Sequence, residues 1–349
     1  MNYPKGSIWR RWDLHVHTPA SIIQEYGGDN DETWERFLSE LENLPPEFKV
    51  LGINDYLFID GYRRVHEEKA QGRLTNIDLI LPIIELRLDK FGGTDSHLSK
   101  VNYHIMFSDE IDPDIIQHQF INALYSSYCL SPIYESLQPE WVAVPTRESL
   151  ADLGRKIIDS VPEEKRGQFG PPLIEGFNNV TFKREDILKI LGASYFRGKC
   201  LTAVGKTEWW NIKWNDHSIA DKKNIINSAH FVFVSAETVS DCRRAKQQLS
   251  TSGVNDRLLD CSDAHRFSDA SYKDRIGKCY TWIKADPTFR GLVLALYEPD
   301  MRIFLGDAPP KVQVVDGNRT KYIRSVRIRR KSDSTLDEIW YDDVELAQS

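Results

Sequence analysis

Residues 12–18 read WDLHVHT, and they open the pattern that decides the fold of this chain. The stretch is short and largely apolar, which predicts a strand. DETWERFLSELENL (31–44) follows with apolar residues at helical spacing and ends at Pro45-Pro46, and FKVLGINDY (48–56) predicts the next strand. A strand, a helix and a second strand in this order predict neighbouring parallel strands.

The same alternation continues to about residue 300. We expect strands over 78–88, 101–107, 200–209, 230–236, 257–265 and 278–285, and helices over 61–72, 112–126, 147–160, 183–192, 219–228, 238–249 and 287–297. The stretch 129–182 is rich in Pro, Gly and polar residues, which indicates an insertion or a long connection. The pattern predicts an α/β fold around a parallel sheet, open or closed into a barrel.

The overall composition is that of a globular protein. The chain has 349 residues, of which 41% are hydrophobic and 28% charged, and a net charge of −7. This charge argues against coating nucleic acid through bulk charge, although a local basic patch is compatible with it. No apolar run predicts a signal peptide or a membrane span. Five cysteines without a CxxC pair indicate a reducing cytoplasm: Cys129, Cys200, Cys242, Cys261 and Cys279.

Side chains that bind metal stand at or near the ends of most predicted strands. Two imidazoles form an HxH pair, an acid and a further imidazole follow on later strands, and a DxH pair closes the series: His15, His17, Glu85, His104, Asp263 and His265. Side chains two apart on a strand share a face, so both imidazoles of the first pair can reach one ion. One strand-end histidine is more often a simple hydrogen-bonding group, but the series on successive strands favours a metal site for Zn, Mn or Fe.

The segments WDLHVHTPAS, LGINDY, LPIIEL, NYHIMF and CSDAH resemble successive motifs of the PHP (polymerase and histidinol phosphatase) superfamily. The resemblance covers roughly residues 10 to 300 and implies a distorted (β/α)7 barrel that hydrolyses phosphate esters. It also implies that His15, His17, Glu85 and Asp263 hold one metal ion, and that Glu85 and His104 hold a second. His265 would belong to a third ion.

Two departures from the superfamily pattern argue against that third ion. Ser21 is followed by Ile22 and Ile23 where many members carry a metal-binding side chain, and Tyr56 replaces the histidine of the second motif. We therefore expect one or two divalent ions. Asp55, just before Tyr56, either replaces a ligand or orients a ligand imidazole. Asp55, Asp263 and His265 are also the candidates to move a proton during hydrolysis.

A later histidine of the superfamily is also missing, and its expected strand reads TAVGKTEWW. Lys206 is a candidate to hold a phosphate oxygen, and Glu208 a candidate to complete the second metal site. A surface ion pair between the two is an equally good interpretation. Trp209, Trp210 and Trp214 offer rings for base stacking, although packing in the core or at a rim is the more common use of such rings.

More narrowly, WDLHVHTPAS, GKTEWW and IWYDDVEL resemble TrlF-type proteins, in which a PHP domain precedes an ABC/SMC-like ATPase. This implies a PHP domain over 1–308 and an extension over 309–349 that contains the basic, alternating KYIRSVRIRR and could begin a linked ATPase. Gly205-Lys206-Thr207 is not a phosphate-binding loop, because Cys200 stands where the motif requires glycine.

These features predict a metal-dependent phosphoesterase that attacks phosphodiesters with a metal-activated water. A nuclease acting in defence against foreign nucleic acid, together with an ATPase domain or subunit, fits the narrower resemblance. Two alternatives stay open. One is a phosphatase of small monoesters, and the other is a degenerate PHP domain that serves as a platform for an ATPase partner.

Overall fold

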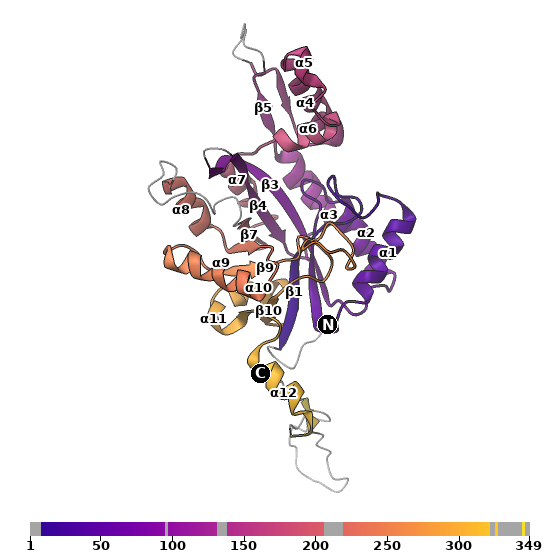
Figure 1. Ribbon diagram of the computed structural model, residues 1–349, viewed down its shortest axis with the longest axis vertical. Helices are drawn as coiled ribbons and strands as arrows, with labels where there is room; N and C mark the ends of the chain where they lie inside the picture. Colours follow the sequence, from indigo (N-terminus) through magenta and orange to yellow (C-terminus); the bar gives the residue numbers. More distant parts are fainter. Residues whose placement is uncertain are drawn as a thin grey trace.

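The computed structural model describes residues 8–94, 97–130, 138–205 and 219–321, and the backbone of 325–326 and 344–345. Within these residues the chain is an α/β protein with a mixed nine-stranded sheet and helices packed around it (Figure 1). The strands of this sheet, in spatial order, are β11 (Ile303–Leu305), β10 (Thr281–Lys284), β1 (Trp9–Val16), β2 (Phe48–Asn54), β3 (Leu79–Thr94), β4 (His97–Phe107), β7 (Cys200–Gly205), β8 (Phe231–Val234) and β9 (Leu258–Asp260).

The α-helices of the described chain follow the predicted alternation closely. They are α1 (Asp31–Glu42), α2 (Asp60–Ala70), α3 (Pro113–Ile115), α4 (Arg147–Ser160), α5 (Glu163–Arg166), α6 (Pro172–Asn179), α7 (Arg184–Leu191), α8 (Ile219–Ser228), α9 (Val239–Thr251), α10 (Phe289–Ala295), α11 (Pro299–Arg302) and α12 (Pro310–Gly317). α3 continues through a π-helical and a 3₁₀ turn to Ala123, which together form the helix expected over 112–126. Strand β11 and helices α5, α6, α11 and α12 were not predicted.

The sheet curls into a nearly closed, barrel-like form. Beyond β9 the chain returns to the end of β1, where Val16 forms an isolated parallel bridge with Ala264. The His17 amide donates to the Ala264 carbonyl oxygen at 3.0 Å. Seven strands therefore follow one another around the ring: β1, β2, β3, β4, β7, β8 and β9. Strand β10 pairs with the first residues of β1, Trp9 to Arg11, and β11 pairs with β10, so these two strands extend the sheet beyond the ring.

The prediction of a parallel sheet is right for most of this ring and wrong for β4. β1, β2 and β3 are parallel, as are β7, β8 and β9, but β4 is antiparallel to both β3 and β7. The reason is the connection between β3 and β4. Only residues 95–96 separate the two strands, too few for the crossover that parallel neighbours require. β10 and β11 are antiparallel as well.

The buried residues divide into a core inside the ring and a core beneath the helices. On β3, Leu79, Leu81 and Ile83 face inward, whereas Ile80 and Ile84 pack toward the outer helices. Because both faces are covered, this strand is an almost unbroken apolar run. Glu85 lies two residues after Ile83, so its side chain also points into the ring. It stands near one open end of the ring, which we call the mouth.

The segment 129–182 is an inserted module, as expected, but it is more ordered than a long connection. Its described part contains α4, α5, α6 and strand β6 (Trp141–Ala143), which forms a hairpin with β5 (Ser126–Tyr128), the strand just before the segment. The module projects from the end of the sheet where the β3–β4 hairpin also extends (Figure 1). Two glycines allow α4 and α6 to approach closely. A methyl group at Gly154 would lie 1.8 Å from the Pro172 carbonyl oxygen, and one at Gly176 would lie 1.8 Å from that of Leu150.

We predict that Gly154→Ala destabilises this module. The added methyl must push α4 and α6 apart, and overpacking of this kind costs about 1–3 kcal/mol. Gly167→Ala is the matched control, since a methyl group there meets nothing within 4 Å. Limited proteolysis and thermal melts of the two variants measure the difference. Equal melting temperatures and equal cleavage within α4–α6 would contradict the close packing.

The last expected strand of the ring is shorter than predicted. β9 ends at Asp260, so Asp263 and His265 lie on the following loop rather than on a strand. Asp263 adopts a φ of 53°, a left-handed conformation that is uncommon for a residue other than glycine. In the tail, Ser325–Val326 pairs with Val344–Glu345 in a short antiparallel ladder. None of the described helices is both long and apolar enough to cross a membrane.

Candidate metal centre

A register shift near the end of β1 aims both histidines of the HxH pair into the ring. The pairing of β1 with β2 is irregular between Asp13 and Val16. Leu14 packs in the inner core, whereas Val16 packs in the outer core, so the alternation slips by one residue between them. β-Bulges re-aim side chains in this way. As a result, the Nε2 atoms of His15 and His17 face each other at 3.1 Å inside the mouth.

Glu85 and His104 come together because they are direct cross-strand partners in β3 and β4. Glu85 does not end its strand, as the sequence pattern suggested, since β3 continues to Thr94, whereas His104 lies within β4, as expected. The His104 Nε2 lies 3.5 Å from the Glu85 Oε2, and the His15 Nε2 lies 3.3 Å from the same oxygen. Ligand atoms of these three buried residues lie within 4.8 Å of one another, and we call them the Glu85 group.

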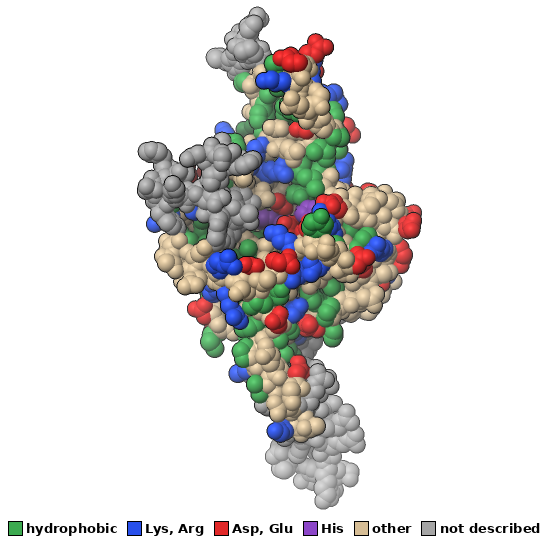
Figure 2. Space-filling view, in the orientation of Figure 1, with side chains coloured by type: hydrophobic (Ala, Val, Ile, Leu, Met, Phe, Trp, Pro, Cys, Tyr) green, Lys and Arg blue, Asp and Glu red, His purple; other side chains and the backbone are tan. Residues whose placement is uncertain are grey.

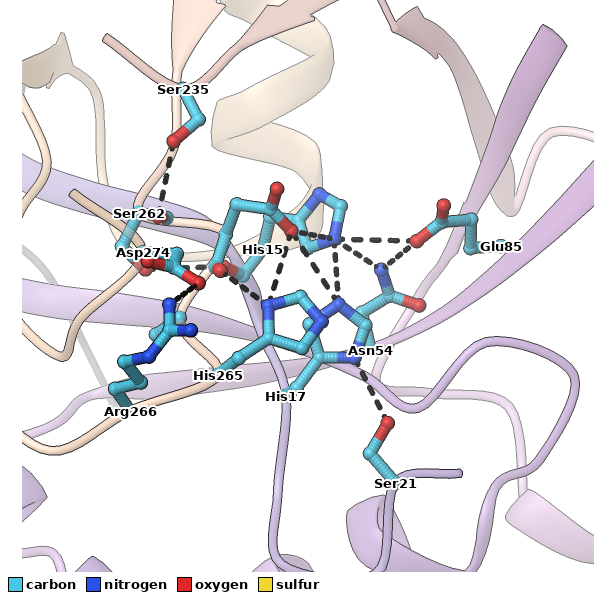
Figure 3. Close-up of polar contacts among 12 residues, drawn as sticks. His15, His17, Ser21, Asn54, Glu85, Ser235, Ser262, His265, Arg266 and Asp274 are labelled. Atoms are coloured by element: carbon cyan, nitrogen blue, oxygen red, sulfur yellow. Dashed lines mark hydrogen bonds and ion pairs between the residues drawn. The ribbon is translucent and has the colours of Figure 1, made fainter. Parts of the chain in front are cut away.

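A second set of donors shares His15 with the first. Asp263 Oδ1 lies 3.1 Å from the His15 Nε2 and 3.6 Å from the His17 Nε2. We call His15, His17 and Asp263 the Asp263 group; its ligand atoms also lie within 4.8 Å of one another. Figure 3 shows that the shared residue, His15, lies next to Glu85 of the first group and next to His17 of the second.

The spacing of these atoms fits a metal ion. Ligands that bind at 2.0–2.2 Å around a tetrahedral ion stand about 3.4 Å apart, and the printed contacts of 3.1–3.6 Å agree with this value. His104 gives independent support. Among the described residues, neither of its ring nitrogens has a hydrogen-bond partner although the side chain is buried. Buried polar atoms are seldom left unpaired, so a ligand for this imidazole is expected.

The electrostatics of the site point the same way. Burial opposes ionisation of Glu85, but the imidazoles of His104 and His15 outweigh it and hold the pKa of the carboxyl well below its usual range. Burial likewise opposes ionisation of Asp263, yet His15, His17 and His265 lower its pKa. For His15, the carboxylates of Asp263 and Glu85 overcome burial and raise the pKa to about 9. The two carboxylates thus favour a positive charge between them. In the metal-free protein the protonated His15 ring provides this charge.

This proton makes metal binding dependent on pH. Because His15 carries a proton below pH 9 and must lose it to bind an ion, we predict that affinity rises with pH, about tenfold per unit across the neutral range. Binding should release about one proton for the first ion. Calorimetry in buffers of different ionisation enthalpy measures that number. Uptake without proton release, at an affinity that does not change between pH 6 and 8, would contradict the assignment of His15.

Sequence reasoning missed Asn54, the residue at the centre of the polar network. Its Nδ2 lies 2.7 Å from the His15 Nε2 and donates to the Glu85 Oε2 at 2.8 Å. Ser21 was noted only for its neighbours, yet its hydroxyl lies 3.2 Å from the His17 Nδ1. The available signal was the alternation of β2, which places Asn54 on the same inward face as Val50. Ile22 and Ile23 pack against the outer core.

Asp55 is buried and faces the loop after β1 rather than the imidazoles. Its carboxylate accepts hydrogen bonds from the Thr18 amide at 2.8 Å and from the Thr18 hydroxyl at 2.7 Å. Burial raises the pKa of this carboxyl to about 7, against the lowering effect of the Thr18 bonds. Asp55 is in neither donor group. Of the two interpretations from sequence, the contacts favour an orienting residue, because Thr18 directly follows His17.

Residues 206–218 lie outside the described part of the chain. The interpretations of Lys206 and Glu208, and those of Trp209, Trp210 and Trp214, therefore have no structural counterpart here. His265, in contrast, is close to the centre, with its ring stacked on that of His17 at 4.0 Å between centroids. Figure 2 shows histidine at the surface where the projecting module meets the body, bordered by basic and acidic side chains.

No protein-family model matches the chain, and no curated protein matches it significantly. The fold and the two donor groups therefore stand on sequence and geometry alone. What they establish is an α/β protein with a barrel-like sheet and a buried cluster of imidazoles and carboxylates that could hold a metal ion.

Proposed function

We propose that this chain is a metal-dependent phosphoesterase of the PHP type that hydrolyses phosphodiesters, nucleic acid strands among them. The observation that carries the proposal is the pair of donor groups that share His15 at the mouth of the ring. Three of their residues are also the HxH pair and the closing acid of the superfamily pattern. Seven successive strands in the ring are in keeping with a (β/α)7 barrel, and catalytic groups of α/β barrels gather at one mouth.

The Nε2 of His15 can bind only one ion, and this indicates how the donor atoms divide between two ions. His15, His17, Asp263 and one oxygen of Glu85 make a four-donor set for a first ion. His104 and the other oxygen of Glu85 remain for a second. Mixed imidazole and carboxylate donors suit Mn, Zn or Fe. When bound, such ions supply an activated water and polarise the phosphoryl oxygen.

The residues of the chain hold and orient this centre. Asn54 donates to Glu85 and fixes the carboxylate. Ser21 fixes the His17 ring from its far nitrogen. Asp263 is the most open of the carboxylates, with 42% of its side chain accessible to solvent. Substrate is therefore expected to approach from the side of Asp263, while Glu85 and His104 lie deeper.

The test compares bis-p-nitrophenyl phosphate with p-nitrophenyl phosphate, each with Mn²⁺ and with a chelator. Faster hydrolysis of the diester, lost on chelation, supports the proposal. Preference for the monoester would assign the site to small-molecule phosphate esters instead. If the diester is cleaved, single-stranded DNA and RNA are the next substrates to assay. An ABC/SMC-like ATPase, linked or separate, is the partner that we propose on the narrower resemblance.

One observation favours a second candidate, a platform without activity. Tyr56 stands at the site where the superfamily pattern has a metal-binding histidine, and its hydroxyl is bonded to His265. Metal analysis of the purified protein separates the two candidates. A metal content near zero together with no esterase activity on added Mn²⁺ would favour the platform.

A further inference from the structure

His265 differs from the other imidazoles of the centre because both of its ring nitrogens are engaged. Its Nδ1 donates to the backbone carbonyl of Asp263 at 2.8 Å. A carbonyl oxygen can only accept, so this nitrogen carries the hydrogen. In the neutral ring, the Nε2 lone pair then accepts from the Tyr56 hydroxyl, 2.9 Å away. In the charged ring both nitrogens carry hydrogens, so neither state offers a lone pair to an ion.

Tyr56 is itself fixed from several directions. Its amide donates to the Asn54 Oδ1 at 3.2 Å, and its carbonyl accepts from the Glu85 amide at 3.0 Å. Its ring packs on that of His17 at 4.5 Å, and edge to face on that of Phe177 at 4.8 Å. The backbone adopts a φ of 59°, an uncommon conformation for a bulky residue that is retained where its surroundings determine it.

The inserted module contributes to this arrangement. Phe177 belongs to α6, and the Arg87 guanidinium lies over its ring at 4.2 Å from the centroid. The Arg87 guanidinium also donates to the Phe177 carbonyl at 2.9 Å. The Tyr56 ring is therefore held between the metal centre and the inserted module.

We propose that Tyr56 withdraws His265 from metal binding, which limits the centre to the ions that His15, His17, Glu85, His104 and Asp263 can hold. His104 marks the contrast: it belongs to the Glu85 group, and apart from the 3.5 Å contact of its Nε2 with the Glu85 carboxylate its nitrogens have no hydrogen-bond partner among the described residues. Tyr56 thus sets the number of ions at two or fewer. The inference rests on the metal centre proposed above, but not on the reaction that it performs.

The test counts ions rather than turnover. The full chain and its variants are loaded with Mn²⁺ or Zn²⁺, freed of excess ions and analysed by mass spectrometry for metal content. His265→Ala is expected to keep the wild-type content, whereas His104→Ala loses one equivalent. Tyr56→His is expected to gain one equivalent, because it supplies a second imidazole beside a released His265 and Asp263. Tyr62→Phe, at a buried tyrosine of α2, is the control for loss of a hydroxyl.

A second measurement is independent of these variants. We expect the Nε2 of the neutral His265 ring to show an acceptor-type ¹⁵N shift, and to keep a shift of this type rather than that of a metal-bound nitrogen when Zn²⁺ is added. Loss of one equivalent in a folded His265→Ala, or the ¹⁵N shift of a metal-bound nitrogen at His265 on adding Zn²⁺, overturns the role of Tyr56 and leaves the centre intact. A wild-type chain that binds no ion overturns the centre itself, and this inference with it.

Discussion

Replacing His15 by alanine will remove the tightly bound ion and the hydrolysis that depends on it. The His15 Nε2 lies within 3.3 Å of Glu85, Asp263 and His17, so no other side chain of the centre touches as many donors. Loss of an outer partner of a ligand costs 10–100-fold in metal affinity, and loss of this ligand should cost more than about 100-fold. Metal content after dialysis, and diester hydrolysis, measure the effect.

His118→Ala is the control for this variant, since His118 is exposed on the turn after α3 and lies in neither donor group. It should bind and hydrolyse as the wild type does. The double change of His15 and His17 to alanine is expected to leave no ion bound at the Asp263 group. If that variant keeps its full metal content and activity, the site has been assigned to the wrong residues.

The strands of the ring and most ligand candidates could be predicted from the sequence because they depend on local pattern. The apolar run of 78–88 needs both faces covered, and a metal ligand two residues after another on a strand shares its face. The second rule placed the side chain of His17 on the same face as that of His15, and the structure has the two rings in contact. These rules need no knowledge of the distant chain.

What the sequence did not predict depends on distant neighbours. The direction of β4 follows from a two-residue connection, so His104 reaches Glu85 as a cross-strand partner and not as a neighbouring strand end. The bulge in β1 arises where the chain also meets Ala264, far away in sequence. Asn54 became a site residue only when β2 was placed between β1 and β3. An asparagine in the sequence did not by itself indicate a metal ligand or a catalytic group.

Changing Glu85 to glutamine will separate metal binding from folding more cleanly than any other change. Glu85 is the carboxylate that both ions share in the proposed centre, and it is buried beside His15 and His104. Glutamine has almost the same shape, and its carbonyl oxygen can accept the bond that Asn54 donates. A neutral amide is a poor ligand, so we expect loss of both ions and a fall in hydrolysis of at least about 1000-fold, several kcal/mol of activation free energy.

Removing one partner of a buried ion pair usually destabilises a protein by about 3–5 kcal/mol, because a charge is left unpaired. Here we expect a much smaller loss in the metal-free protein. The Asp263 carboxylate contributes more than Glu85 to the raised pKa of His15 and lies 3.1 Å from its Nε2, so the charge on the ring keeps a partner in the variant. Thermal melts in chelator should therefore nearly coincide for Glu85→Gln and the wild type, while only the wild type is stabilised by added Mn²⁺. A variant that still gains stability from Mn²⁺ would show that Glu85 binds no ion.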